Sequence, residues 1–222
     1  MNSKFKFLAL AIFMIFFNLQ TKASSVLLPM DDEGQQNHLK AYGITYWALA
    51  KSYKVNWLLN YRGGSFLLPD GDDIRKECQI RGVSFEVLTD GATAAILEKA
   101  PKIAVYTPKG KQPWDDAVTM VLTYAEIPYT EIYDEEVLSD QLVLYEWLHL
   151  HHEDFTGQYG KFFGNYRNAP WYIQQKLEAE ALAKKLGFNK VSEEKRAVAT
   201  KIRDYVIGGG FIGVEMAENF AE

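Results

Sequence analysis

Short apolar segments alternate with helical segments along most of this chain, and this alternation restricts the folds that it can adopt. Residues 102–107 are the clearest strand, because they are mostly apolar, include β-branched side chains and are followed by Pro108. Such a run is typical of a strand buried on both faces of a parallel sheet. Similar runs predict strands at residues 55–61, 65–68, 83–87, 129–133 and 142–148. Helical patterns occur at residues 35–53, 70–81, 93–100, 114–125, 135–140, 171–186 and 192–206.

Strands that alternate with helices through short connections predict an α/β fold with a mostly parallel sheet and helices on both faces. The composition, with 48% hydrophobic and 14% aromatic residues, is that of a globular protein. The net charge of −5 argues against general nucleic-acid binding. Cys78 is the single cysteine, so no internal disulfide can form, and we interpret Cys78 as a small buried residue.

The N-terminus has the features of a signal peptide. Lys4 and Lys6 precede an uncharged apolar run at residues 7–17, and Ala23 offers a small residue for cleavage. The apolar run is short for a membrane crossing, so we expect no stable span after processing. We therefore predict a signal peptide at residues 1–23 and a single exported α/β domain at residues 24–222, located in the periplasm or secreted.

Three of the four histidines fall within four residues, directly after the predicted strand at residues 142–148. Ligands of parallel sheets gather at the carboxyl ends of strands, so this run is our main candidate site. Tyr159, in the irregular segment that follows, is added as an aromatic contact for a sugar or peptide. The candidate ligand-binding residues are His149, His151, His152, Glu153, Asp154 and Tyr159.

The histidine run leaves three interpretations open. On a strand, His149 and His151 point the same way and suit a metal ion, with Glu153 or Asp154 as a further ligand. The run superficially resembles the His-x-His-x-Asp-His signature of metallo-β-lactamase-like hydrolases, but its final histidine is missing. A metal-free polar site and hydrogen-bonded structural histidines are the alternatives. Zinc is therefore a candidate cofactor at His149 and His151.

A glycine-rich motif lies near the end of the chain. Gly208, Gly210 and Gly213 fit the pattern Gly-x-Gly-x-x-Gly, and residues 206–222 resemble the nicotinamide-binding stretch of pyridine-nucleotide disulfide oxidoreductases. In that motif the glycines follow a strand and approach a pyrophosphate. The acidic residue that would bind the ribose has no counterpart in this chain, so we expect no NAD or FAD binding. The alternative is a helix that ends with Gly208 as its C-cap and is followed by a short strand.

Several longer stretches resemble an exported family of Bacteroidetes-type bacteria that is labelled asparagine synthetase B. The similarity covers residues 27–206 and is carried by residues 27–32, 37–43, 57–69 and 147–159. The resemblance implies a class I glutamine amidotransferase-like, flavodoxin-like fold. Asparagine synthetase activity is not expected, because the N-terminal nucleophilic cysteine and the Ser-Gly-Gly-x-Asp-Ser loop of those enzymes are absent. Relatives continue after the Gly-Gly-Phe turn into a Cys-Ser segment, which this chain lacks.

We therefore expect an amidotransferase-like or hydrolase-like α/β domain of unknown substrate, which lacks its expected nucleophile and is incomplete at its C-terminus. One alternative is a non-catalytic module that binds a small molecule, a sugar, a peptide or a metal. A second alternative is a fragment of a flavin or nicotinamide oxidoreductase.

Overall fold

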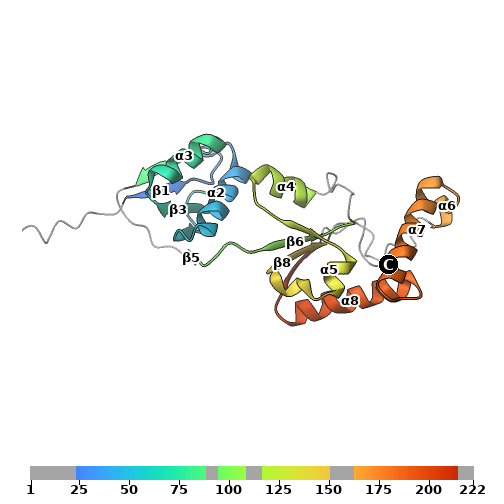
Figure 1. Cartoon of the computed structure of the whole chain (residues 1–222). Helices are drawn as coiled ribbons and strands as arrows, with labels where there is room; N and C mark the ends of the chain where they lie inside the picture. Colours follow the sequence, from blue (N-terminus) through green and yellow to red (C-terminus); the bar gives the residue numbers. More distant parts are fainter. Residues whose placement is uncertain (1–23, 89–94, 109–116, 151–162, 215–222) are drawn as a thin grey trace, which may run out of the picture. The chain divides into compact units, whose positions relative to one another are not determined.

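The chain forms two compact units, Met1–Lys99 and Ala100–Glu222, and each contains one β-sheet (Figure 1). The computed structural model describes residues 24–88, 95–108, 117–150 and 163–214. The segment that we predict to be a signal peptide lies outside these residues. Within them, no helix combines the length and the apolar character that a membrane crossing requires.

The N-terminal unit is built on an antiparallel sheet of five strands in the order β4-β1-β3-β2-β5. The strands are β1 (Ser25–Leu28), β2 (Val55–Leu58), β3 (Ser65–Pro69), β4 (Glu86–Leu88) and β5 (Ala95–Leu97). Two helices accompany them, α2 (His38–Ala50) and α3 (Asp72–Arg81). The mostly parallel arrangement predicted from the sequence therefore does not extend to this sheet.

The turn between β2 and β3 fixes the chain that follows β1. Gly63 has a φ of +76°, and a Cβ at this position would lie 2.2 Å from the carbonyl oxygen of Met30. Only glycine allows this close approach without displacing the backbone. The Arg62 guanidinium donates to Asp31 at 2.7 Å and to Glu86 at 2.6 Å, so the same turn also holds the start of β4.

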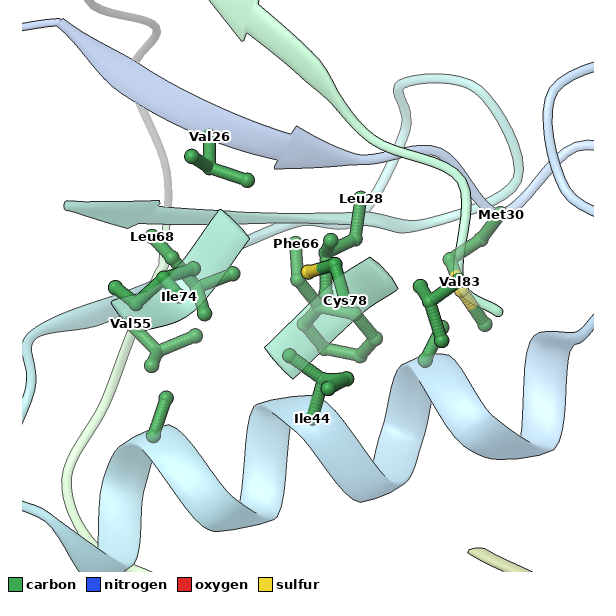
Figure 2. Close-up of a cluster of buried hydrophobic side chains, with 12 residues drawn as sticks. Val26, Leu28, Met30, Ile44, Val55, Phe66, Leu68, Ile74, Cys78 and Val83 are labelled. Atoms are coloured by element: carbon green, nitrogen blue, oxygen red, sulfur yellow. The ribbon is translucent and has the colours of Figure 1, made fainter. Parts of the chain in front are cut away.

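Both helices pack on one face of this sheet. Figure 2 shows Ile44 of α2 pointing towards Phe66 of β3 and Cys78 of α3. Phe66 is 3% exposed and packs edge-on against Tyr42 at a centroid distance of 5.5 Å. Cys78 is fully buried, and burial raises its pKa to about 11. Cys78 is therefore a packing residue, which agrees with our interpretation of the sequence.

Two expectations for this unit were wrong in detail. The helix predicted at residues 35–53 is shorter, since α2 runs from His38 to Ala50. Its N-cap is Asn37, whose side chain accepts a hydrogen bond from the Lys40 backbone N–H. Within the predicted helix at residues 93–100, Ala95–Leu97 instead form β5, which pairs with β2. Alanine favours a helix, but helix propensities of ordinary residues differ by less than about 1 kcal/mol each, and pairing with an open strand edge outweighs them.

The C-terminal unit contains a parallel sheet of four strands in the order β7-β6-β8-β9. The strands are β6 (Ile103–Tyr106), β7 (Thr130–Ile132), β8 (Trp147–Leu150) and β9 (Phe211–Val214). The helices are α4 (Ala117–Ala125), α5 (Asp134–Leu138), the 3₁₀ helix η1 (Gln141–Leu144), α6 (Phe163–Tyr166), α7 (Pro170–Lys185) and α8 (Val191–Ile207). All four residues of β6 are buried, so its prediction as a central strand is confirmed.

Helices α5 and α8 cover one face of the parallel sheet. On this face Ala104, Leu148 and Leu150 pack against side chains from the two helices. Those helical side chains include Val137, Val198 and Ile202, which are at most 5% exposed. The alternation of strand residues places Val105 and His149 on the opposite face, where both are also buried. The prediction that helices cover both faces of the sheet stays a prediction.

The strand predicted at residues 142–148 was displaced. Residues Gln141–Leu144 form η1, and the strand β8 begins only at Trp147. Leu142 is buried, whereas Val143 is 81% exposed and Leu144 is 56% exposed. An apolar run of this length does not distinguish a strand from a short helical turn that uses a single core residue. The displaced strand still occupies a central place, between β6 and β9.

The predicted α/β class is confirmed, since the described residues combine helices with a parallel sheet. The remaining predicted helices form close to their expected bounds, as α3, α4, α5, α7 and α8. The flavodoxin-like or amidotransferase-like identity of the fold is a finer statement and belongs to the proposal below.

Candidate functional site at the carboxyl edge of the parallel sheet

His149, the first member of the predicted histidine site, lies within β8 and is 1% exposed. It pairs in register with Val105 of β6 and Gly213 of β9. The remaining members, His151, His152, Glu153, Asp154 and Tyr159, lie outside the described residues. Among the residues that are described, no group of three or more histidine, cysteine or acidic side chains could hold a metal ion. The zinc interpretation therefore stays a prediction that rests on the sequence.

A different set of polar side chains meets at the carboxyl ends of β6 and β7. Tyr106 is the last residue of β6, and Asp134 begins α5 two residues after the end of β7. Lys195, near the start of α8, contributes the ammonium group that lies at the centre of the set. We name this set the Lys195 cluster, which consists of Tyr106, Tyr133, Asp134, Glu194 and Lys195.

The hydrogen bonds within the Lys195 cluster use every proton of the ammonium group. Lys195 Nζ donates to Asp134 Oδ2 at 2.6 Å, to Tyr133 Oη at 2.9 Å and to Tyr106 Oη at 3.2 Å. The Tyr106 hydroxyl donates in turn to Asp134 Oδ1 at 2.5 Å. The ammonium also lies 4.3 Å from the centre of the Tyr133 ring, within cation–π range. These contacts join α8, α5 and β6 at one point.

Glu194 is the unusual member of the cluster. Its residue is 1% exposed, and its Oε1 has no hydrogen-bond partner among the described residues. Burial, and then the negative charge of Asp134, raise the pKa of Glu194 to about 7, although Lys195 acts in the opposite direction. A carboxyl group with a pKa near neutrality can both accept and donate a proton at the pH where most enzymes work.

The cluster is also unbalanced in charge. It brings two carboxyl groups together with a single ammonium group, all at most 8% exposed. Burying an uncompensated charge is costly, so one carboxyl group must keep a proton or acquire another positive partner. The arrangement is therefore suited to proton transfer, with a fixed positive charge beside the transferring group.

This cluster was not predicted from the sequence, although parts of its signal are visible there. Tyr106 and Asp134 both stand at the ends of predicted strands, where ligands of parallel sheets bind. We read the segment from Ser192 to Lys195 only as the start of a helix. Its position over the carboxyl edge follows from the tertiary packing of α8 against α5. No local pattern contains that information.

The three glycines of the dinucleotide-like motif have structural explanations. Gly208 is the C-cap of α8, so these glycines follow a helix, whereas in a dinucleotide site they follow a strand. A Cβ on Gly210 would lie 2.2 Å from the Tyr205 ring. A Cβ on Gly213 would lie 2.7 Å from Trp147 Nε1. The structure thus contains the alternative arrangement, a helix that ends with Gly208 as its C-cap and is followed by the short strand β9.

We predict that Gly210→Ala destabilises the C-terminal unit by about 1–3 kcal/mol, because the added methyl group would overlap the Tyr205 ring. Chemical denaturation measures this change. Gly164→Ala is the matched control, since no contact within 4 Å of the added carbon is found among the described residues beyond its own stretch of helix, and it should cost nothing. Equal stability of the two variants would contradict the packing role of Gly210.

A second candidate region lies at the opposite, amino edge of the parallel sheet. This hollow of about 560 Å³ is lined by Tyr145, Tyr205 and Gly208–Gly210 among others. Lys201, which also lines it, is paired with Asp140 at 2.5 Å. Glu146 and Asp204 line it as well, but neither is buried, so the described side chains of this hollow lack the buried charge imbalance of the Lys195 cluster. We therefore place the candidate site at the carboxyl edge.

The aromatic residues after the histidine run are only partly described. Tyr166 and Trp171 lie with ring centroids 5.2 Å apart, and Trp171 contacts Tyr172 at 5.7 Å. Tyr172 is 9% exposed, whereas Trp171 is 44% exposed. These rings therefore pack on one another around the start of α7, and Trp171 stays partly exposed.

Comparisons of the chain with protein-family models, with curated proteins and with solved structures find no match. We therefore infer the function from the geometry of the chain itself.

Proposed function

We propose that the C-terminal unit is a hydrolase-like α/β domain of an exported protein, with its reaction site at the carboxyl edge of the parallel sheet. The observation that carries the proposal is the Lys195 cluster, a buried and charge-unbalanced set of proton-transfer groups at the edge where parallel sheets bind ligands. The resemblance of residues 27–206 to an amidotransferase-like family supports the same class of fold.

The residues present favour hydrolysis by water over an amidotransferase mechanism. Residues 100–222 contain no cysteine, so a thiol nucleophile is not available in this unit. Glu194, with a pKa of about 7, can accept a proton from an attacking water. The Lys195 ammonium would stabilise the negative charge that develops on a carbonyl or similar group. Because Glu194 is buried, the first turn of α8 must move before a substrate can contact it.

A second candidate function is a non-catalytic binding module. The observation that favours it is the burial of Asp134 and Glu194, which are each 1% exposed and so do not meet a ligand in this conformation. In that case a small polar ligand would contact the half-buried Tyr133 at the surface of the cluster. The position of the glycines after a helix offers no support for the third alternative, a nicotinamide or flavin oxidoreductase.

The test uses the full chain and a panel of chromogenic ester, amide and glycoside substrates. We expect measurable hydrolysis by the wild-type protein and by Glu193→Gln, an exposed neighbour on the same helix. Glu194→Gln should lower the rate about 100-fold or more, because the variant cannot accept a proton. Wild-type activity in Glu194→Gln would refute the role of Glu194. Absence of hydrolysis with retained ligand binding would favour the binding module, and micromolar NADH affinity would favour the oxidoreductase.

A further inference from the structure

We propose that the buried Glu194 keeps a proton beside the Lys195–Asp134 ion pair, and that loss of this proton releases the first turn of α8 from the parallel sheet. The proposal concerns the attachment of a helix and does not depend on hydrolase activity. Release of this turn would make the buried groups of the Lys195 cluster accessible at the carboxyl edge, and it would depend on pH.

The geometry of the cluster requires a compensating charge. Lys195 Nζ already donates its three protons to Asp134 and the two tyrosine hydroxyls. Its single positive charge balances the Asp134 carboxylate, with which it forms a 2.6 Å ion pair. Glu194 Oε1 has no hydrogen-bond partner in the described part of the chain, so an ionised Glu194 would be an uncompensated buried charge. A proton on Glu194 removes this charge without any rearrangement.

The other acidic groups on α5 and beside η1 have partners of their own. On α5, Glu135 binds Lys185 of α7 at 3.0 Å, and Glu136 accepts a hydrogen bond from the Tyr133 backbone N–H at 3.0 Å. Beside η1, Asp140 binds Lys201 of α8 at 2.5 Å. Asp134, Lys195 and the hydroxyls of Tyr106 and Tyr133 are the groups whose hydrogen-bond network lies beside Glu194.

The direction of the pH effect follows from the two states of Glu194. In an unfolded chain Glu194 loses its proton near its ordinary pKa of 4.5, whereas in the folded protein burial raises the pKa to about 7. Between these values the folded state holds one more proton than the open state. Its stability is therefore fully present below about pH 4.5 and falls as the pH rises through about 7, after which it levels off.

Hydrogen exchange of the full chain measures this opening. We expect the protection of α8 amides, corrected for intrinsic exchange, to fall on the order of 100-fold between about pH 5 and pH 8. In Glu194→Gln the amide side chain carries no charge, so the protection should stay constant across this range. Glu193→Gln, one residue away and exposed, should follow the wild-type curve. A flat wild-type curve, or a Glu194→Gln curve that falls like the wild type, would overturn the proposal.

A measurement on the wild-type protein keeps the proposal testable if Glu194→Gln does not fold. Carbon-13 NMR of protein labelled at the glutamate carboxyl should contain one resonance that titrates with a midpoint near pH 7. Titration of every glutamate near its ordinary pKa of 4.5 would overturn the proposal. Protection at pH 8 that depends on the choice of Na⁺ or K⁺ would assign the compensating charge to a bound cation and would overturn it too.

Discussion

Lys195→Met is expected to destabilise the C-terminal unit by about 3–5 kcal/mol, because the variant leaves the Asp134 carboxylate buried without its positive partner. The Tyr106 and Tyr133 hydroxyls lose a donor in the same change. Methionine keeps the length and the apolar stem of lysine, so packing changes little. Hydrogen exchange of peptides from β6 and α8 measures the free energy of opening for this unit.

Two further variants test whether the loss arises from the buried charge. Lys201→Met removes an ammonium from the same helix, but the Lys201–Asp140 pair is exposed, so we expect a cost of about 0–1 kcal/mol. Adding Asp134→Asn to Lys195→Met removes the stranded carboxylate and should recover part of the stability. A Lys195→Met protein as stable as Lys201→Met would show that the buried ion pair does not hold α8 in place.

Phe66→Ala is expected to destabilise the N-terminal unit by about 3–5 kcal/mol, the usual cost of deleting a buried aromatic ring. Phe66 is 3% exposed and lies at the centre of the core that joins the sheet to α2 and α3 (Figure 2). Its ring contacts Tyr42 at 5.5 Å and stacks on Trp57 at 6.2 Å, so two aromatic contacts disappear with it. Hydrogen exchange of peptides from β1 and β3 follows the change.

The matched control is Ile80→Ala on α3, whose side chain is 67% exposed. Surface truncations of this kind change stability by no more than about 0.5 kcal/mol. A Phe66→Ala protein that is as stable as Ile80→Ala would mean that this cluster does not form the core of the unit.

The sequence predicted the parallel sheet because its central strand carries a strong local signal. Residues 103–106 are apolar on both faces, which only a strand covered on both sides requires. The antiparallel sheet was not predicted, because its direction is decided by pairing between distant segments. β1 pairs with β3 and with β4, and neither partner is recognisable from the short apolar run at residues 26–28. The register and direction of paired strands therefore depend on tertiary contacts, which a short run of sequence does not contain.

The candidate site illustrates the same limit. The histidine run was predicted as a site because three histidines stand close together in the sequence, yet His149 is a buried strand residue. The Lys195 cluster joins residues as far apart as Tyr106 and Lys195, which are 89 positions apart. Local spacing cannot reveal such a set. The glycine motif shows that a local spacing can also mislead. Its spacing matches a dinucleotide site, but Gly210 and Gly213 are explained by their close contacts with Tyr205 and Trp147.

A crystallographic fragment screen of the full chain tests most directly whether the carboxyl edge is the binding site. The Lys195 cluster predicts that small polar fragments bind beside Tyr133 and the first turn of α8. It also predicts that Tyr133→Phe, which removes only the hydroxyl that accepts from Lys195, weakens their binding, whereas Tyr129→Phe does not. Fragments that gather instead in the amino-edge hollow, against Tyr205 and Gly208–Gly210, would contradict the assignment of the site.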